Sequence, residues 1–189
     1  SFFEYKKIKM NKFIKKIIFQ SFKIFFSNKI SYWKKLDANL RTNLNNVIDK
    51  KFDQFWNSYK IDCENYLLLN RSTNWIKWHF QKKIDDNDAW IISLNDNNKL
   101  LGYAICSDTS NNKINLKRIS IVDLVSLGDN EKVYLSLIKK CILEAKKRNY
   151  HTVEFIGYKK LKRDIFSKFK PFKRKLAFPF FYKPKNQTY

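Results

Sequence analysis

The sequence predicts a mixed α/β layered fold, in which a mostly antiparallel sheet is flanked by helices and preceded by a helical N-terminal extension. Two apolar runs joined by an Asn-rich turn, over residues 89–108, indicate a β-hairpin. Residues 130–148 place apolar side chains at helical spacing, and strand-like runs precede and follow this segment. The chain has 189 residues, of which 44% are hydrophobic, so it can bury a substantial core.

The N-terminal part is expected to be an extension or linker, over residues 1–46, that follows a missing preceding region. Residues 10–26 predict a helix with one apolar face and one basic face. Two interpretations are open for such a helix: it lies on an anionic membrane surface, or it packs on its own domain or a neighbouring one. Residues 27–46 are polar and predict a connector with some helix.

The second part, residues 47–189, is expected to form the main domain. It predicts a helix over 47–59, a short strand over 67–69, and a helix that Ser72 caps. The hairpin, a strand over 114–125 and the helix over 130–148 follow, and the apolar face of that helix consists of Tyr134, Leu137, Ile138, Cys141 and Ala145. A strand over 151–158, a basic helix over 160–169 and a last strand over 173–184 complete the chain.

The composition narrows the function classes. Lys and Arg number 39 against 17 Asp and Glu, a net charge of +22, which attracts polyanions unless the lysines are simply solvated. No basic block is long enough for a nucleic-acid arm, so nucleic acid is not an expected partner. The three cysteines are far apart and only two histidines are present, so neither a disulfide nor a metal site is expected. We expect a cytoplasmic protein, and peripheral membrane contact through residues 10–26 is one of the two interpretations left open for that helix.

Several segments resemble the GNAT acyltransferase family. "NKLLGYAICSD" is similar to its third strand, "ISIVDLVSL" lies where its fourth strand belongs, and "DIFSKFKPF" is similar to the segment after its fifth strand. Upstream, "FDQFWNSY" and "NRSTNWIKWHF" resemble GNAT-like members linked to polysaccharide or cell-surface glycan biosynthesis. The resemblance implies acetyl-CoA or another acyl-CoA as cofactor, a small-molecule or glycan-precursor amine as acceptor, and a related half preceding this one.

The resemblance also implies where the cofactor binds, between the fourth and fifth strands and at the start of the next helix. The corresponding residues are Leu124, Val125, Gly128, Asp129, Asn130, Glu131 and Lys132. The family loop is Q/R-x-x-G-x-G/A, and "SLGDNEK" lacks the leading Gln or Arg and the second Gly. Asp129 is expected to be the helix N-cap, and with Glu131 it would repel a pyrophosphate. An ordinary capped helix is therefore the alternative to a working CoA site.

A basic run in the last predicted helix bears on the same question. It consists of Lys159, Lys160, Lys162 and Arg163, and it either offsets the repulsion at the loop or forms a solvated face.

Asp123 is the candidate general base, because it lies in an apolar strand on the face that strict alternation gives to Ile119, Ile121 and Val125. The alternative is a buried ion pair or a hydrogen bond to the backbone. Glu154 is a second candidate. The family's general acid is a Tyr, but the matching position is Phe166, so Tyr158 is the substitute candidate.

The last expectation concerns three residues that would line the binding site of the acceptor. Arg71, Trp75 and Trp78 either form an acceptor-site wall or pack in the core. The sequence thus predicts an acyl-CoA-dependent N-acyltransferase. The alternative is a non-catalytic module of the same fold that binds a partner domain, an anionic polymer or a membrane surface.

Overall fold

The computed structural model describes residues 40, 42–44, 46–63, 68–156 and 159–172. The predicted helix over 10–26, most of the connector, the last strand and Tyr158 lie outside these residues.

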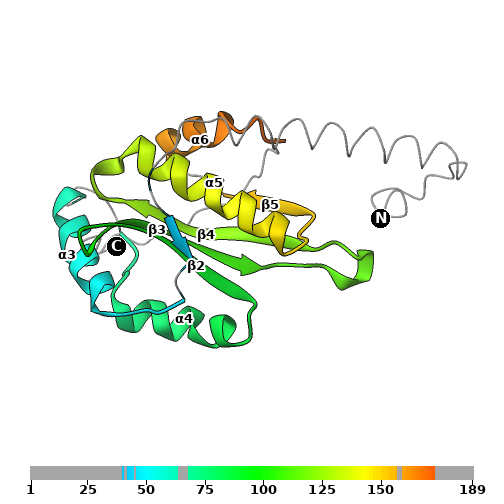
Figure 1. The fold of residues 1–189 in the computed structure, drawn as a ribbon, viewed down its shortest axis with the longest axis horizontal. Coiled ribbons are helices and arrows are strands. Elements are labelled where there is room, and N and C mark those ends of the chain that lie inside the picture. The colour runs from blue at the N-terminus through cyan, green and yellow to red at the C-terminus, as the bar shows by residue number, and fades with distance from the viewer. Residues whose placement is uncertain (1–39, 41, 45, 64–67, 157–158, 173–189) are drawn as a thin grey trace, which may run out of the picture.

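Five strands form a single sheet in the order β1-β2-β3-β4-β5 (Figure 1). They are β1 (Thr42–Leu44), β2 (Ala89–Asp96), β3 (Lys99–Asp108), β4 (Arg118–Ser126) and β5 (Thr152–Phe155). Neighbouring strands are antiparallel except β4 and β5, which are parallel. The predicted fold class, a mostly antiparallel sheet flanked by helices, is therefore confirmed.

The turn between β2 and β3 is the part of the sheet that its local sequence explains most directly. Its two turn residues, Asn97 and Asn98, have φ angles of 43° and 71°. Asn tolerates this left-handed region better than other non-Gly residues, and two such residues match the twist of a tight hairpin.

Helices cover both faces of the sheet (Figure 1). α5 (Glu131–Lys147) packs on one face, together with α6 (Lys160–Ser167), and buries its predicted apolar side chains there. α3 (Lys50–Asp62) and α4 (Thr73–Asp85) form the other layer, over a second core cluster that includes Phe52, Phe55, Ile76 and Tyr103. Ser72 caps α4 as predicted, through a hydrogen bond from Trp75 N at 3.4 Å. No helix in the described ranges is both long and apolar enough to cross a bilayer.

Gly102 sets the distance between three elements. A Cβ at this position of β3 would lie 2.7 Å from the Val125 carbonyl oxygen of β4 and 2.7 Å from Val133 Cγ1 of α5. The start of α5 can approach the sheet this closely only because residue 102 has no side chain.

A β-bulge interrupts β4 at Val122. Ile105 pairs with Asp123 while the next residue of β3, Cys106, pairs with Ile121, so Val122 is the extra residue. Such an insertion bends the strand and reverses which face the following side chains occupy. This bulge lies at the position where β4 and β5 cease to pair.

Three predicted elements differ from the structure. Residues 42–44, expected in a connector, form the edge strand β1, whose three residues are too few for a recognisable alternation. Leu68 and Leu69 are irregular rather than part of a strand. β4 begins at Arg118 rather than at residue 114, because a 3-10 turn over Asn112–Ile114 precedes it and Asn115 is left-handed.

Candidate functional site

The candidate site lies at the end of β4 that extends beyond its last residue pair with β5. The last paired residues are Ile121 and Phe155, whereas β4 continues to Ser126. Within the described ranges, no strand pairs with Val122–Ser126 on the β5 side. Val122 is 46% exposed, so this edge is accessible at the bulge. An extended ligand that carries amide groups has the geometry to occupy such an edge.

One lysine of α6 reaches this edge. Lys162 Nζ donates a hydrogen bond to the Leu124 carbonyl oxygen at 2.6 Å, and it lies 5.6 Å from the ring centroid of Tyr134. Burial lowers the pKa of Lys162; the charges of Arg71 and Lys159 act in the same direction, against Asp123 and Asp129. The run of basic residues over 159–163 is therefore not a uniform solvated face.

Asp123 is paired rather than free. Its carboxylate accepts from Arg71 Nε at 2.9 Å and from Arg71 Nη2 at 3.1 Å, and Tyr103 donates its hydroxyl at 3.0 Å. The side chains of Arg71 and Asp123 are each 12% exposed. Burial alone would lower the pKa of Arg71, but the Asp123 charge and hydrogen bond outweigh it and raise this pKa. Burial and Asp123 also hold the pKa of the enclosed Tyr103 hydroxyl well above its usual value.

The structure thus shows the ion pair of Asp123 and also a backbone hydrogen bond, which Asp123 Oδ1 accepts from Leu124 N at 3.0 Å. The role of general base stays a prediction, and it requires that Arg71 release the carboxylate. The predicted set of face neighbours is partly wrong: Ile119 and Ile121 belong to the cluster under α5, whereas Val125 lies on the α3 and α4 side with Tyr103. The bulge at Val122 is the reason, because one extra residue breaks strict alternation.

The N-terminus of α5 is capped by its own residues. Asn130, not Asp129, is the N-cap, and its Oδ1 accepts from Lys132 N at 2.9 Å and from Val133 N at 3.3 Å. The prediction that Asp129 caps the helix is therefore wrong. Asp129 instead lies in a tight turn with φ of 50°, next to Gly128 with φ of 59°.

Carboxylates surround this helix start. Asp62, at the end of α3, accepts from Gly128 N at 3.0 Å. Asp129 accepts from the Tyr134 hydroxyl at 2.8 Å and pairs with Lys159, while Glu131 pairs with Lys168. Burial would raise the pKa of Asp129, but Lys159 and Tyr134 outweigh it and lower this pKa. Three backbone donors at this helix start, Gly128 N, Lys132 N and Val133 N, are thus already bonded within the chain and are not available to an anion in this arrangement.

The three residues of the expected acceptor-site wall lie in different surroundings. Arg71 binds Asp123, and its guanidinium lies 5.7 Å from the ring centroid of Tyr59. Trp75 is half-buried and stacks on His79, with ring centroids 3.8 Å apart. Trp78 is 81% exposed, so it is not part of the core. A role of the three in acceptor binding stays a prediction.

Phe166, at the position of the family's general acid, and Glu154, the second candidate base, contact other residues. Phe166 stacks on Phe155, with ring centroids 4.8 Å apart, and has no proton to donate. Glu154 lies 3.6 Å from Arg118 in an ion pair. Tyr158 lies outside the described residues, so its role as general acid stays a prediction.

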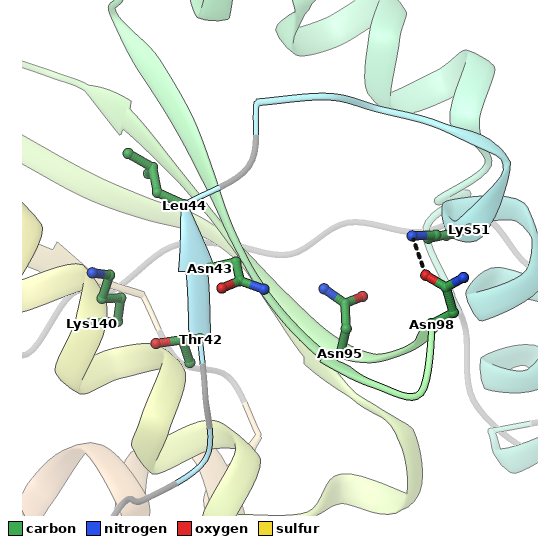
Figure 2. Close-up of a pocket in the computed structure, with 7 residues that line it drawn as sticks. All are labelled: Thr42, Asn43, Leu44, Lys51, Asn95, Asn98 and Lys140. Carbon is green, nitrogen blue, oxygen red and sulfur yellow. Dashed lines mark hydrogen bonds between the residues drawn. The ribbon is translucent and has the colours of Figure 1, made fainter.

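A shallow polar groove lies elsewhere, at the β1 edge of the sheet (Figure 2). It is lined by Thr42, Asn43, Leu44, Lys51, Asn95, Asn98 and Lys140. Lys51 Nζ donates to Asn98 Oδ1 at 3.1 Å across one end of it. Within the described part of the chain, no cluster of three or more His, Cys, Asp or Glu is placed to hold a metal ion.

Two side chains at the site were not singled out as its members from the sequence, and a third, Lys162, was singled out only as part of a basic run. Asp62 and Tyr103 carry no local pattern, because each meets its partner across a distance of many residues in the chain. Lys162 is one of four basic residues over 159–163, and helical spacing alone cannot show which of them faces β4.

Comparison with solved structures places this architecture among acetyltransferases. An aminoglycoside acetyltransferase from an uncultured soil metagenomic sample, in complex with trehalose, superimposes with a TM-score of 0.58 at 17% identity, covering 80% of this chain and 100% of its own. A predicted acetyltransferase with acetyl-CoA from Clostridium acetobutylicum gives 0.56 at 15%, covering 74% and 96%. Glucosamine-6-phosphate N-acetyltransferase from Arabidopsis thaliana gives 0.56 at 8%, covering 76% and 99%.

A GNAT family acetyltransferase from Staphylococcus aureus gives a TM-score of 0.52 at 16% identity, covering 76% of this chain and 98% of its own. No family model and no curated protein matches the sequence. At these identities the comparisons show the fold: the chain has the architecture of GNAT acetyltransferases.

Proposed function

We propose that this protein is an acyl-CoA-dependent N-acyltransferase, which transfers an acetyl or other acyl group to a small-molecule amine. The observation that carries the proposal is that the pairing of the parallel strands β4 and β5 ends at Ile121 and Phe155, beside the bulge at Val122. This leaves the edge of Val122–Ser126 for the amide-containing arm of the acyl donor. The similar structure with acetyl-CoA supports this choice of donor.

The acceptor is proposed to be an amino sugar or a glycan precursor. Two similar structures support this class, one an aminoglycoside acetyltransferase and the other a glucosamine-6-phosphate N-acetyltransferase. Arg71 and Asp123 lie beside the β4 edge and are the residues proposed to bind or deprotonate the amine.

Calorimetric titration of the full chain with acetyl-CoA tests the donor. We expect binding at or below concentrations on the order of 1 mM. Asp62→Asn should tighten it about fivefold, because a carboxylate about 4 Å from the diphosphate repels it by about 1 kcal/mol per unit charge at a water-like dielectric, and the substitution removes that carboxylate charge. Asp96→Asn, at the exposed hairpin end, changes net charge equally and should leave affinity unchanged. The donor proposal fails if neither the unmodified chain nor Asp62→Asn binds.

A second candidate function, a non-catalytic module of the same fold, is favoured by the start of α5. Asn130 and Asp62 already bind the backbone donors there, and Phe166 cannot act as an acid. Absence of acetyl-CoA binding together with steeply salt-dependent binding to anionic vesicles or nucleic acid would support this module.

A further inference from the structure

Lys162 is an amine held inside the gap that the acyl donor is proposed to enter. Its Nζ reaches from α6 to the Leu124 carbonyl oxygen at 2.6 Å, one residue beyond Asp123 on the β4 edge. The two other lysines of the same basic run bind elsewhere: Lys159 pairs with Asp129, and Lys160 pairs with Asp164 at 2.7 Å. Lys162 is therefore set apart from its neighbours by position.

We propose that Lys162 is an internal acyl acceptor, so that a thioester lying along the β4 edge transfers its acyl group to Lys162 Nζ. This inference rests on the donor position proposed above. In the step, the neutral Nζ attacks the thioester carbonyl carbon, the C–N bond forms and the C–S bond breaks. The departing thiolate takes the proton that the nitrogen loses, and the products are an N-acyl-lysine and the free thiol.

The surroundings of Lys162 favour the neutral amine that this step needs. Its pKa is lowered by burial, and the positive charges of Arg71 and Lys159 add to this effect, while Asp123 and Asp129 oppose it. The Tyr134 ring centroid lies 5.6 Å from Nζ, and this contact favours the cation, so it acts against the effect of burial. The acylated nitrogen keeps one N–H, which can still donate to the Leu124 carbonyl, so the product loses a charge without losing this hydrogen bond.

Mass spectrometry of labelled peptides tests the proposal without an acceptor substrate. The full chain is incubated with acetyl-CoA, or with the small thioester S-acetyl-N-acetylcysteamine, which has no phosphates, and separately with acetic anhydride. Lys160 on the same helix is the internal reference, since it is highly exposed and forms an ion pair with Asp164. We expect the ratio of Lys162 to Lys160 acetylation rates to be at least tenfold higher with a thioester than with the anhydride.

Two variants fix the assignment. Lys162→Arg keeps the cation and its donor, so it should fold and lose the fast labelling, whereas Lys160→Arg should retain it. An equal ratio for thioesters and anhydride overturns the inference, and it does so without touching the donor proposal if acetyl-CoA still binds by calorimetry. Selective labelling by the small thioester without acetyl-CoA binding supports Lys162 as acceptor and rejects CoA as donor.

Discussion

At the scale of single residues, the Arg71–Asp123 pair is the best-defined charge interaction of the site. Both side chains are largely buried, and the guanidinium binds the carboxylate through two hydrogen bonds. Such a pair costs solvation that its attraction only partly offsets, and loss of one partner leaves an isolated buried charge. A buried pair of this kind is therefore weak evidence for added stability.

Removing one partner should therefore cost more than removing both. Arg71→Met leaves Asp123 uncompensated, and we expect it to lower the free energy of unfolding by about 3 kcal/mol. The double variant Arg71→Met with Asp123→Leu should recover more than half of this loss, as measured by urea denaturation. If the double variant loses as much free energy of unfolding as Arg71→Met alone, or more, the pair is not energetically coupled.

Substitutions at Gly102 and Gly128 should destabilise the fold to different extents. Gly102→Asn should destabilise the fold by about 3 kcal/mol, because its Cβ meets backbone and Val133 at 2.7 Å. Gly128→Asn should cost under about 1 kcal/mol, since nothing lies within 4 Å and Asn tolerates its φ of 59°. Thermal unfolding of both variants distinguishes them. Similar losses in melting temperature would contradict this assignment of steric and conformational causes.

At the scale of elements, the sequence predicted best where one local pattern determines the structure. The apolar spacing of residues 130–148 suffices for α5, and Asn97 with Asn98 suffices for the hairpin turn. The edge strand β1 was missed because three residues carry no pattern of their own, and they are strand only because they pair with β2.

The candidate site was harder to predict, for two physical reasons. A bulge adds one residue without a composition signal, so the faces of β4 could not be assigned on both sides of Val122. In addition, the N-cap depends on backbone angles: Asp129 and Asn130 are equally suitable by type, and only Asn130 has the extended φ and ψ of a cap. Contacts such as Asp62 with Gly128 exist only after α3 and the loop meet in the fold.

At the scale of the whole molecule, acid should unfold the protein partly through carboxylates whose folded pKa is lowered. Asp129, bound by Lys159 and Tyr134, and Asp108, bound by Ser110 and by Tyr150 at 2.7 Å, are two such groups. Their contribution is complete above the unfolded Asp pKa of about 3.9 and is lost as pH falls through the lower folded pKa.

Asp129→Asn checks this dependence. Asn also tolerates the φ of 50° at this position, so the change removes charge with little conformational effect. We expect it to lower the free energy of unfolding by up to about 1 kcal/mol at pH 7, and this difference should vanish as the native carboxylate becomes protonated. Urea denaturation at pH 7, 5, 4 and 3 measures it. A difference that stays constant over this range would assign the effect to something other than ionisation.

The bulge at Val122 also bears on self-association, because no strand in the described ranges pairs with the part of β4 that follows it on the β5 side. A strand edge without a partner is a template on which another chain can add a strand, and sheets commonly guard such edges with a lysine. Lys162 holds that position on the edge of Val122–Ser126. We therefore expect neutralisation of Lys162 to favour intermolecular β-structure at the exposed part of this edge, around Val122.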